Sequence, residues 1–272
     1  MFLILIVWAI TIALPIVGSL TFWPVRHAYD FYIPIILAVA GFFIGVFFIF
    51  VLASICALPM KRKNKEWTKV SKWSTFWIKQ GMTFINHHAL VICKLVGKEK
   101  MPKNGRFLLV CNHRSNFDPM LITEKLGKYE IGWITKRSNY KIPIARNLMP
   151  SVFYQPIDRD DPLQSLQVMK NSIELINKGI TSVGVFPEGR RANDGLLTNF
   201  HEGVFNIAIK AHCPIVIVTV KGTERISGRY PWKFTKVRME VVRVLQPEEF
   251  ETQPAKTVSD NVHAIMLENL SE

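Results

Sequence analysis

The chain has 272 residues, of which 49% are hydrophobic, and carries a formal net charge of +13 at pH 7 with an isoelectric point near 9.7. This length holds one sizeable domain with a buried core plus an appendage. Its four cysteines are scattered and form no CxxC pair, which excludes a disulfide framework and favours reduced thiols packed as small apolar side chains. The excess of cations fits nucleic acid or an anionic membrane surface, so the positions of the charges must decide between them.

Two apolar stretches open the chain. Residues 1–25 and 31–60 contain no charged side chain, and each exceeds the roughly 20 residues that cross the hydrocarbon core of a bilayer as a helix. The first stretch lacks the basic start and the small-residue cleavage site of a signal peptide. The short link between the stretches carries residues typical of headgroup level, namely Trp23, Arg26, Tyr29 and Tyr32. Residues 1–60 are therefore predicted to form a membrane-anchoring helical hairpin.

A basic run, KRKNK at residues 61–65, directly follows the second stretch. Because basic residues beside a span favour the cytoplasmic side, the rest of the chain is predicted to lie on the cytoplasmic face of a membrane. The hairpin then returns the N-terminus to the same side. A shallower hairpin that re-enters one leaflet fits the same lengths, so the spanning and the re-entrant arrangement both stay open.

Residues 61–97 are predicted to form a basic amphipathic segment at the membrane interface. Over residues 65–78, a helical projection of about 100° per residue separates lysines from apolar residues. The lysine side holds Lys65, Lys69, Lys72 and Lys79, with Phe76 misplaced among them, and the apolar side holds Trp67, Val70, Trp73, Trp77 and Ile78. An ordinary amphipathic helix packed on the domain would show the same pattern. No nucleic-acid reading motif accompanies the lysines, so membrane phospholipid is the expected partner and nucleic acid is not.

Residues 98–272 are predicted to form an α/β domain, because short apolar runs alternate with helical periods. The predicted strands are residues 107–111, 132–135, 152–155, 182–186, 215–220 and 236–245, and the predicted helices are residues 119–126, 162–178, 202–212 and 255–270. This alternation is typical of a mixed, largely parallel sheet flanked by helices. In such sheets, functional residues gather beyond the carboxyl ends of the strands.

The sequence NHRSNFD, residues 112–118, follows the first of these strands and holds His113 and Asp118 five positions apart. On a continuous helix, five residues turn about 500°, which leaves the two side chains about 140° apart. They can meet only where a strand turns into a helix, and there an imidazole and a carboxylate can act together as a general base. Alternatively, Asp118 followed by Pro119 is a good helix N-cap with no catalytic role.

Two further polar turns carry arginine. FPEGRR, residues 186–191, follows a predicted strand, and its guanidinium groups are suited to phosphate. PIDRDD, residues 156–161, contains Arg159, which either meets phosphate or pairs with its acidic neighbours. Each turn by itself is equally well a solvated surface turn. The chain has no HExxH, Walker A, GxGxxG or GxSxG motif, and no metal site is predicted.

Taken in order, four blocks resemble the glycerolipid acyltransferases, and most closely the 1-acylglycerol-3-phosphate acyltransferases of the PlsC type. They are Asn112 and His113 with Asp118, IDR at residues 157–159, FPEG at residues 186–189, and CPIVIV at residues 213–218. The resemblance covers about residues 70–250, and a membrane-associated N-terminal helical pair is also similar to that family. It implies an enzyme of phospholipid biosynthesis.

The resemblance implies transfer of a fatty acyl group from acyl-CoA or acyl carrier protein to the sn-2 hydroxyl of lysophosphatidic acid, which gives phosphatidic acid. His113 would be the general base that takes the hydroxyl proton, and Asp118 would hold the imidazole tautomer. No covalent acyl-enzyme is required, so neither Cys111 nor Ser115 need be a nucleophile. The thioester is a co-substrate, and no cofactor is implied.

The same resemblance assigns the acceptor's phosphate and glycerol end to a set of residues comprising Arg159, Glu188, Gly189 and one of Arg190 or Arg191, with Lys136 as a further candidate. The third block of the family usually reads FPEGTRS, whereas this chain has Arg190 in place of threonine and Ala192 in place of serine. These changes leave the acid-base chemistry untouched and bear on the headgroup of the acceptor.

Two alternatives to the lysophosphatidic acid acyltransferase stay open at this point. One is an acyltransferase for another anionic lysophospholipid, which the altered third block would allow. The other is a non-catalytic, membrane-anchored lipid-binding protein that uses its basic face and arginine turns to hold anionic lipid. An intact His113 and Asp118 count against the second alternative, because binding alone needs no base.

Overall fold

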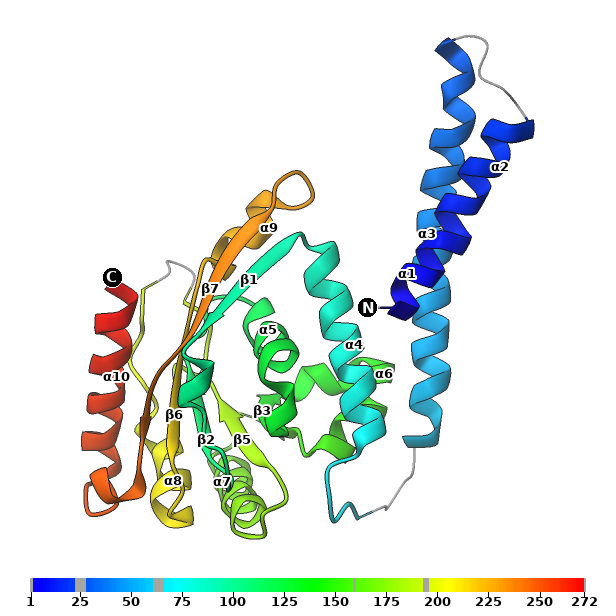
Figure 1. Cartoon of the computed structure of the whole chain (residues 1–272). Coiled ribbons are helices and arrows are strands. Elements are labelled where there is room, and N and C mark those ends of the chain that lie inside the picture. The colour runs from blue at the N-terminus through cyan, green and yellow to red at the C-terminus, as the bar shows by residue number, and fades with distance from the viewer. Residues whose placement is uncertain (1, 23–27, 61–65, 159, 193–195, 272) are drawn as a thin grey trace. The chain divides into compact units, whose positions relative to one another are not determined.

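The computed structural model in Figure 1 describes residues 2–22, 28–60, 66–158, 160–192 and 196–271. The chain divides into two compact units, Met1–Lys61 and Arg62–Glu272. The first unit is helical, and the second contains the sheet.

The first unit is a pair of helices that pack closely on each other. The first arm consists of α1 (Phe2–Trp8), a π-helical turn (Ala9–Ala13) and α2 (Leu14–Phe22), and the second arm is α3 (Tyr32–Ala57), which follows a 3-10 turn (Ala28–Phe31) and continues into another (Leu58–Met60). A Cβ atom on Gly41 would collide with the carbonyl oxygen of Thr11, and one on Gly45 would lie 2.5 Å from the Trp8 ring. Small residues four positions apart allow two membrane helices to approach each other closely.

Among the described residues, one helical segment, Tyr32–Met60, is long and apolar enough to cross a membrane, as judged by length and composition. The other arm contains the shorter apolar helix Leu5–Thr21. Its π-helical turn ends two residues before Pro15, whose nitrogen carries no hydrogen for the helical ladder. The hairpin therefore has one arm of spanning length, and a spanning or re-entrant arrangement stays a prediction.

The second unit is built on one seven-stranded sheet in the order β1-β7-β6-β2-β5-β3-β4. The strands are β1 (Val91–Val96), β2 (Leu108–Cys111), β3 (Ile131–Lys136), β4 (Gln155–Ile157), β5 (Ser182–Val185), β6 (Ile215–Lys221) and β7 (Thr235–Leu245). All neighbouring pairs are parallel except β6 and β7. The predicted mixed, largely parallel sheet flanked by helices is confirmed.

Helices cover both faces of this sheet (Figure 1). The core on one face includes α5 (Phe117–Leu126), against which α4 (Lys72–His88) packs, and the core on the other includes α7 (Pro162–Asn177), α8 (Asn206–Ala211) and α10 (Ala255–Ser271). Two short helices, α6 (Pro143–Leu148) and α9 (Ile226–Arg229), lie in connections. Alternation along β2 explains the two cores, because Leu109 and Cys111 face one and Leu108 and Val110 face the other. All four side chains are fully buried.

The sheet order brings five carboxyl ends to one edge, which we call the catalytic edge. Strands β2, β3, β4, β5 and β6 all run toward it, since each is parallel to its neighbour in that group. Strands β7 and β1 run the opposite way and therefore begin at this edge, at Thr235 and Val91. The catalytic edge consequently collects the turns after β2 and β5, the end of β6 and the connection that precedes β7.

The structure differs from the sequence prediction in three places. The strand predicted at residues 152–155 is β4 (Gln155–Ile157), because Met149–Val152 forms a 3-10 turn and Phe153 has φ +59°. The amphipathic helix predicted at residues 65–78 is α4 (Lys72–His88), which begins at the N-cap Ser71. Strand β1 was not predicted. Its alternation of half-buried and exposed residues puts Lys94 in a strand at the margin of the sheet.

Helix α4 packs on the domain along one side and exposes aromatic rings on another. Ser74 and Ile78, four residues apart, are buried, and Asn86 near the end of the helix donates a hydrogen bond of 2.7 Å to Glu124 of α5. Trp73 and Phe76 are exposed. Part of the predicted apolar face therefore serves the core, as an ordinary packed helix would.

Candidate active site

The turn after β2 is fixed to the neighbouring strand by the side chain of Asn112. Its Oδ1 accepts a hydrogen bond of 2.8 Å from the backbone N–H of Val220, and its Nδ2 donates one of 3.0 Å to the carbonyl oxygen of Val220. The side-chain amide thus replaces a peptide group and adds a rung between β2 and β6. The chain can leave the sheet at residue 112 without leaving Val220 of β6 unpaired.

His113 and Asp118 meet in this turn. The Nδ1 atom of His113 lies 2.9 Å from Oδ2 of Asp118, whose side chain is 0% exposed. The same Oδ2 accepts hydrogen bonds of 2.7 Å from the backbone N–H groups of Arg114 and Ser115. Asp118 lies in the first turn of α5 and points back to the preceding loop, so it does not act as the simple N-cap. The helix N-cap position is Asn116.

A fourth donor reaches Asp118 from a distant part of the chain. The hydroxyl of Thr223, directly after β6 and Gly222, donates a hydrogen bond of 2.5 Å to Oδ1 of Asp118. Both side chains are buried. A carboxylate surrounded by donors is an acceptor only, so we assign the proton between the pair to Nδ1 of His113. The Nε2 atom of His113 then carries the lone pair.

Aromatic stacking fixes the plane of the imidazole. The His113 ring stacks on Phe186 at a centroid distance of 4.3 Å, and Phe186 stacks on Trp133 at 5.0 Å. The indole nitrogen of Trp133 donates a hydrogen bond of 3.2 Å to the hydroxyl of Thr123 in α5. The ring stack therefore contacts one face of the imidazole and the carboxylate binds its Nδ1 atom, which leaves the ring little rotational freedom.

The FPEG turn after β5 clamps the backbone of His113. Oε1 of Glu188 accepts a hydrogen bond of 2.6 Å from the N–H of His113, and Oε2 accepts bonds of 3.1 and 2.9 Å from the N–H and hydroxyl of Thr198. The N–H of Ala192 donates to the carbonyl oxygen of His113 at 2.9 Å. Glu188 is only 3% exposed. Both of its oxygens are thus engaged within the protein.

Gly189 turns the chain sharply beside this clamp. It has φ +67°, a left-handed conformation that favours glycine, and its N–H donates to the carbonyl oxygen of Phe186 at 3.0 Å. A Cβ atom at this position would lie 2.6 Å from Nε2 of His201. Glycine is therefore required both by the backbone angle and by the adjacent ring.

The predicted cationic residues within the described part of the chain lie at the catalytic edge. Arg190 and Arg191 follow Gly189 and are exposed, and the bond from Ala192 to His113 keeps this segment beside the turn after β2. Lys136 ends β3 and is exposed. Arg159 lies outside the described residues. The structure therefore gathers His113, Asp118, Glu188 and Gly189 into one hydrogen-bonded site, with both arginines next in the chain.

Comparison with known proteins finds similarity over the part of the chain that holds most of this site. A sequence model of the family described as Acyltransferase matches residues 92–221. The chain is 34% identical over 131 residues to the chloroplastic 1-acyl-sn-glycerol-3-phosphate acyltransferase BAT2 of Brassica napus, covering 48% of this chain and 37% of that one. It is 35% identical over 131 residues to the chloroplastic enzyme LPAT1 of Arabidopsis thaliana, covering 48% and 36%. Residues 92–221 of this chain are thus similar to the Acyltransferase family, and both of these relatives are 1-acyl-sn-glycerol-3-phosphate acyltransferases.

A solved structure shares the fold of this chain. It is the 1-acyl-sn-glycerophosphate (LPA) acyltransferase PlsC from Thermotoga maritima, with a TM-score of 0.65 and 22% identity over 85% of this chain and 91% of that one. The sequence alignments with the two chloroplast relatives span little more than a third of their length. The family match ends at residue 221, so Thr223 lies just beyond it.

Several residues of the site were not predicted to belong to it. Thr223 and Thr198 carry no motif of their own, and Phe186 was taken only as the end of a strand. Arg114, within the turn, is half-buried, and its Nη1 lies 3.7 Å from Oε2 of Glu224. The only feature of the sequence that could have indicated Thr223 is its position after a predicted strand. Thr223 directly follows the apolar strand β6, whose carboxyl end lies at the same edge as that of β2.

Two candidate nucleophiles, Cys111 and Ser115, lie close to His113 in the chain, and their surroundings differ. Cys111 is fully buried, and burial, followed by the charges of Asp118 and Glu188, raises the pKa of its thiol well above the ordinary value. The thiol therefore stays protonated at neutral pH. The Ser115 hydroxyl accepts a hydrogen bond of 3.4 Å from the N–H of Phe117, which is a turn contact.

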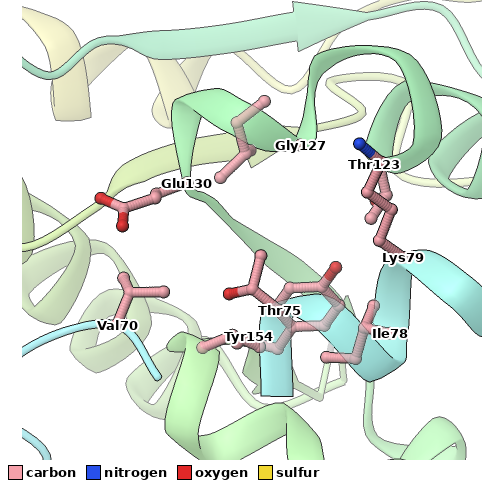
Figure 2. A pocket seen from close by; sticks show the side chains of 10 residues that line it. Val70, Thr75, Ile78, Lys79, Thr123, Gly127, Glu130 and Tyr154 are labelled. Atoms are coloured by element: carbon pink, nitrogen blue, oxygen red, sulfur yellow. The ribbon is translucent and has the colours of Figure 1, made fainter. Parts of the chain in front are cut away.

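A small pocket lies away from His113, between α4, α5 and the start of β3 (Figure 2). It is lined by Val70, Thr75, Ile78, Lys79, Thr123, Gly127, Glu130, Ile131, Val152 and Tyr154. None of the predicted site residues that the structure describes lines it. Thr123 links it to the Trp133 indole, so Trp133 and Phe186 lie between this pocket and His113 along the chain of contacts.

Proposed function

We propose that the chain is a membrane-bound 1-acylglycerol-3-phosphate O-acyltransferase. It moves a fatty acyl group from acyl-CoA or acyl carrier protein to the sn-2 hydroxyl of lysophosphatidic acid, which yields phosphatidic acid and a free thiol. The similarity of residues 92–221 to the Acyltransferase family and the bond of 2.9 Å between His113 and the buried Asp118 support this proposal. The reaction as written needs no cofactor besides the thioester co-substrate.

His113 is the proposed general base. With Nδ1 donating to Asp118, Nε2 takes the proton of the acceptor hydroxyl as its oxygen attacks the thioester carbonyl carbon. Asp118 then stabilises the imidazolium that forms, since its carboxylate is already desolvated and oriented by three other donors. The C–S bond breaks, and the proton on Nε2 passes to the departing thiolate.

Direct transfer without an acyl-enzyme fits the neighbours of the base. A nucleophile on the protein would have to be accessible and easily deprotonated. Cys111 has neither property, because its side chain is fully buried and its thiol pKa is raised. The acceptor hydroxyl therefore attacks the donor in one step of acyl transfer.

The acceptor's phosphate is proposed to meet the exposed cations of the catalytic edge, namely Arg190 or Arg191, with Arg159 and Lys136 as further candidates. Gly189 allows a headgroup to approach the backbone. We assign Glu188 to a different task from that implied by the resemblance. Both of its oxygens accept hydrogen bonds within the protein and the residue is buried, so it positions His113.

The two departures from the usual third block, Arg190 and Ala192, differ in their exposure to solvent. Ala192 is buried, so a serine there would not face the acceptor, whereas Arg190 is exposed beside Arg191. Only Arg190 is therefore positioned to alter headgroup recognition. Two adjacent guanidiniums can contact a phosphate from two directions, which favours lysophosphatidic acid and leaves other anionic lysophospholipids as competing acceptors.

Membrane attachment is proposed to come from the hairpin of residues 1–60. The helical segment Tyr32–Met60 has sufficient length and a mean hydropathy of 3.1 over its most apolar window, and the basic run at residues 61–65 orients the enzyme domain to the cytoplasmic face. The proposed partners are therefore membrane phospholipids, the lysophospholipid acceptor and the acyl donor.

An acceptor panel tests this function. The full chain in detergent is given acyl-CoA or acyl carrier protein and, separately, lysophosphatidic acid, lysophosphatidylglycerol, lysophosphatidylserine and lysophosphatidylcholine, and the free thiol released is measured. We expect release with lysophosphatidic acid above all others. Preference for another anionic acceptor would reassign the substrate, and lipid binding without thiol release from any pair would favour the non-catalytic lipid-binding protein.

A base variant completes the test. His113→Ala should lower the turnover number by about 10³-fold, within the range for loss of a positioned base. His212→Asn is the matched control, because His212 is exposed at the end of α8 and asparagine tolerates its φ of +46°. Full activity in His113→Ala would overturn the mechanism.

A further inference from the structure

The connection between α9 and β7 exposes an unbroken series of side chains. Every residue from 227 to 234 is exposed, in the order Ser-Gly-Arg-Tyr-Pro-Trp-Lys-Phe. Trp232 is 87% exposed, Phe234 61% and Tyr230 49%. Figure 1 shows this connection, in orange, as a loop that extends beyond the sheet. We call residues 229–234 the aromatic loop.

The aromatic loop is held in shape by its own hydrogen bonds. The carbonyl oxygen of Arg229 accepts bonds from the N–H groups of Trp232 at 3.0 Å and Lys233 at 2.9 Å. The guanidinium of Arg229 donates to the carbonyl oxygen of Phe234 at 3.3 Å, which closes the loop. The aromatic rings therefore face outward from an ordered turn whose backbone is partly satisfied from within.

Cations surround these rings. Residues 221–238 contain six basic side chains and one carboxylate, Glu224. That carboxylate lies near Arg114 and Arg225, so its charge is already opposed. Lys233 sits between the two most exposed rings and is itself exposed, as is Lys236. Aromatic rings interleaved with basic side chains are the composition of an anionic membrane interface.

The aromatic loop also lies at the edge of the sheet that carries the base. It begins six residues after Thr223, the donor to Asp118, and leads into β7 at the catalytic edge. On its other side, Phe234 lines a surface hollow with Leu90, Ile92 and the two histidines His87 and His88 that end α4. Ile92 is exposed as well, so the apolar surface continues onto β1.

We propose that the aromatic loop enters the headgroup region of an anionic bilayer as a contact separate from the N-terminal hairpin. Trp232 and Phe234 bury their rings at the level of the lipid carbonyls, and Lys233 and Arg229 meet the lipid phosphates. This contact brings the catalytic edge to the lipid surface. Its role in delivering an acceptor to His113 rests on the proposed function, whereas the contact itself does not.

Fluorescence quenching tests the contact without reference to activity. The full chain is reconstituted in vesicles of phosphatidylglycerol and phosphatidylcholine whose acyl chains are brominated, and tryptophan quenching is compared with that in unbrominated vesicles. We expect Trp232→Phe to lower the quenched share of the emission. Trp133→Phe, which removes an indole buried in the sheet core, should raise that share. A quenched share unchanged by Trp232→Phe would overturn the proposal and turn attention to a protein partner.

Charge reversal tests the contribution of Lys233. With lysophosphatidic acid embedded in anionic vesicles, Lys233→Glu should lower the rate of thiol release about fivefold, the equivalent of roughly 1 kcal/mol for one basic side chain near an anionic surface. With the acceptor dissolved in detergent the rate should stay within twofold. Lys210→Glu is the matched control, because Lys210 is exposed near the end of α8, away from the catalytic edge.

The two proposals fail in different ways. Quenching at Trp232 without thiol release from any acceptor would leave the membrane contact intact and reject the proposed reaction. If Lys233→Glu lowers the rate of thiol release equally in vesicles and in detergent, the membrane role of the aromatic loop is rejected and the proposed reaction stands.

Discussion

Two turns follow neighbouring parallel strands in this protein and are built in opposite ways. In the turn after β2, Asn112, His113 and Asp118 have their polar atoms bound by groups from β6, from the segment after β6 and from the FPEG turn. In the turn after β5, Arg190 and Arg191 present exposed guanidiniums. Proton transfer needs fixed geometry, whereas recognition of an anionic headgroup needs reachable charge.

The contrast also runs within the FPEG turn itself. Glu188 is buried and binds His113, and two residues later the chain is exposed. One short segment therefore supports the base with its first half and presents charge with its second. Changes in the first half should alter the turnover number, and changes in the second should alter the Michaelis constant for the acceptor.

The largest effect is expected at Asp118. Asp118→Asn keeps the shape but presents an amide where four donors now converge, so the imidazole loses the carboxylate that fixes its tautomer. We expect the turnover number to fall by about 10³-fold with little change in the Michaelis constant. Asp160→Asn, an exposed carboxylate before α7, should leave activity intact. A turnover number of Asp118→Asn within threefold of the parent would reject the proposal that the fixed turn after β2 carries out the proton transfer.

Glu188→Gln should combine a catalytic and a structural loss. The amide group of glutamine turns a donor toward either the N–H of His113 or the N–H of Thr198. We expect the turnover number to fall about thirtyfold and the free energy of unfolding to fall by roughly 1–3 kcal/mol, as for a buried group left unsatisfied. Thermal unfolding and steady-state kinetics measure both. A raised Michaelis constant for the acceptor with unchanged stability would instead make Glu188 a substrate ligand.

Thr223→Val removes the hydroxyl that donates to Asp118 and keeps the shape of the side chain. The turnover number should fall about tenfold, in line with loss of a hydrogen bond to a charged group. Thr223→Ser retains the donor and should recover most of the activity, which separates positioning of Asp118 from packing. Full activity in Thr223→Val together with a loss in Thr223→Ser would show that the γ-methyl group, and not the hydroxyl, is what the site requires.

Arg190→Thr restores the residue usual in the family. We expect the Michaelis constant for lysophosphatidic acid to rise about fivefold and the turnover number to stay within twofold, since an exposed guanidinium contributes roughly 1 kcal/mol. Arg191→Gln should act in the same direction. Arg243→Gln, an exposed arginine of β7 paired with Glu249, provides the control. A fall in the turnover number without a change in the Michaelis constant would show that Arg190 acts in the acyl-transfer step and not in binding of the acceptor.

The smallest effect is expected at Cys111. Cys111→Ala should leave the turnover number within twofold and lower the free energy of unfolding by about 1 kcal/mol through the small cavity it creates. Because burial raises the pKa of this thiol, alkylating reagents at neutral pH should leave it unmodified in the folded protein. An acyl thioester on Cys111, detected by mass spectrometry during turnover, would contradict direct transfer.

Local patterns predicted much of the fold. The apolar runs of β2, β5 and β6 and the helical period of α7 and α10 were located to within about two residues, because these elements are long or wholly apolar. Strand β1 escaped prediction because it lies at the margin of the sheet and carries Lys94 in a basic region of the chain. Its assignment depends on pairing with β7, which follows it by more than 130 residues.

The residues of the candidate site also fall into those that a local pattern predicts and those that it does not. His113 and Asp118 are five residues apart, so their meeting in a strand-to-helix turn could be deduced from helical geometry alone. The bonds from Glu188 and Thr223 cross 75 and 105 residues and depend on the strand order, which no local pattern contains. The sequence therefore predicted the two side chains that we propose as the catalytic pair, and the sheet order determined which residues bind them.

The stack of His113 on Phe186 gives the protein an internal spectroscopic reporter. An imidazole whose centroid lies 4.3 Å from a benzene ring, at an interplanar angle of 26°, sits in the shielding cone of that ring. Its carbon-bound protons should therefore be shifted upfield, as should those of His88, whose ring centroid lies 4.0 Å from that of Phe84. The two signals can be told apart because only one of them disappears in His113→Ala, and proton transfer to and from His113 can then be followed by nuclear magnetic resonance.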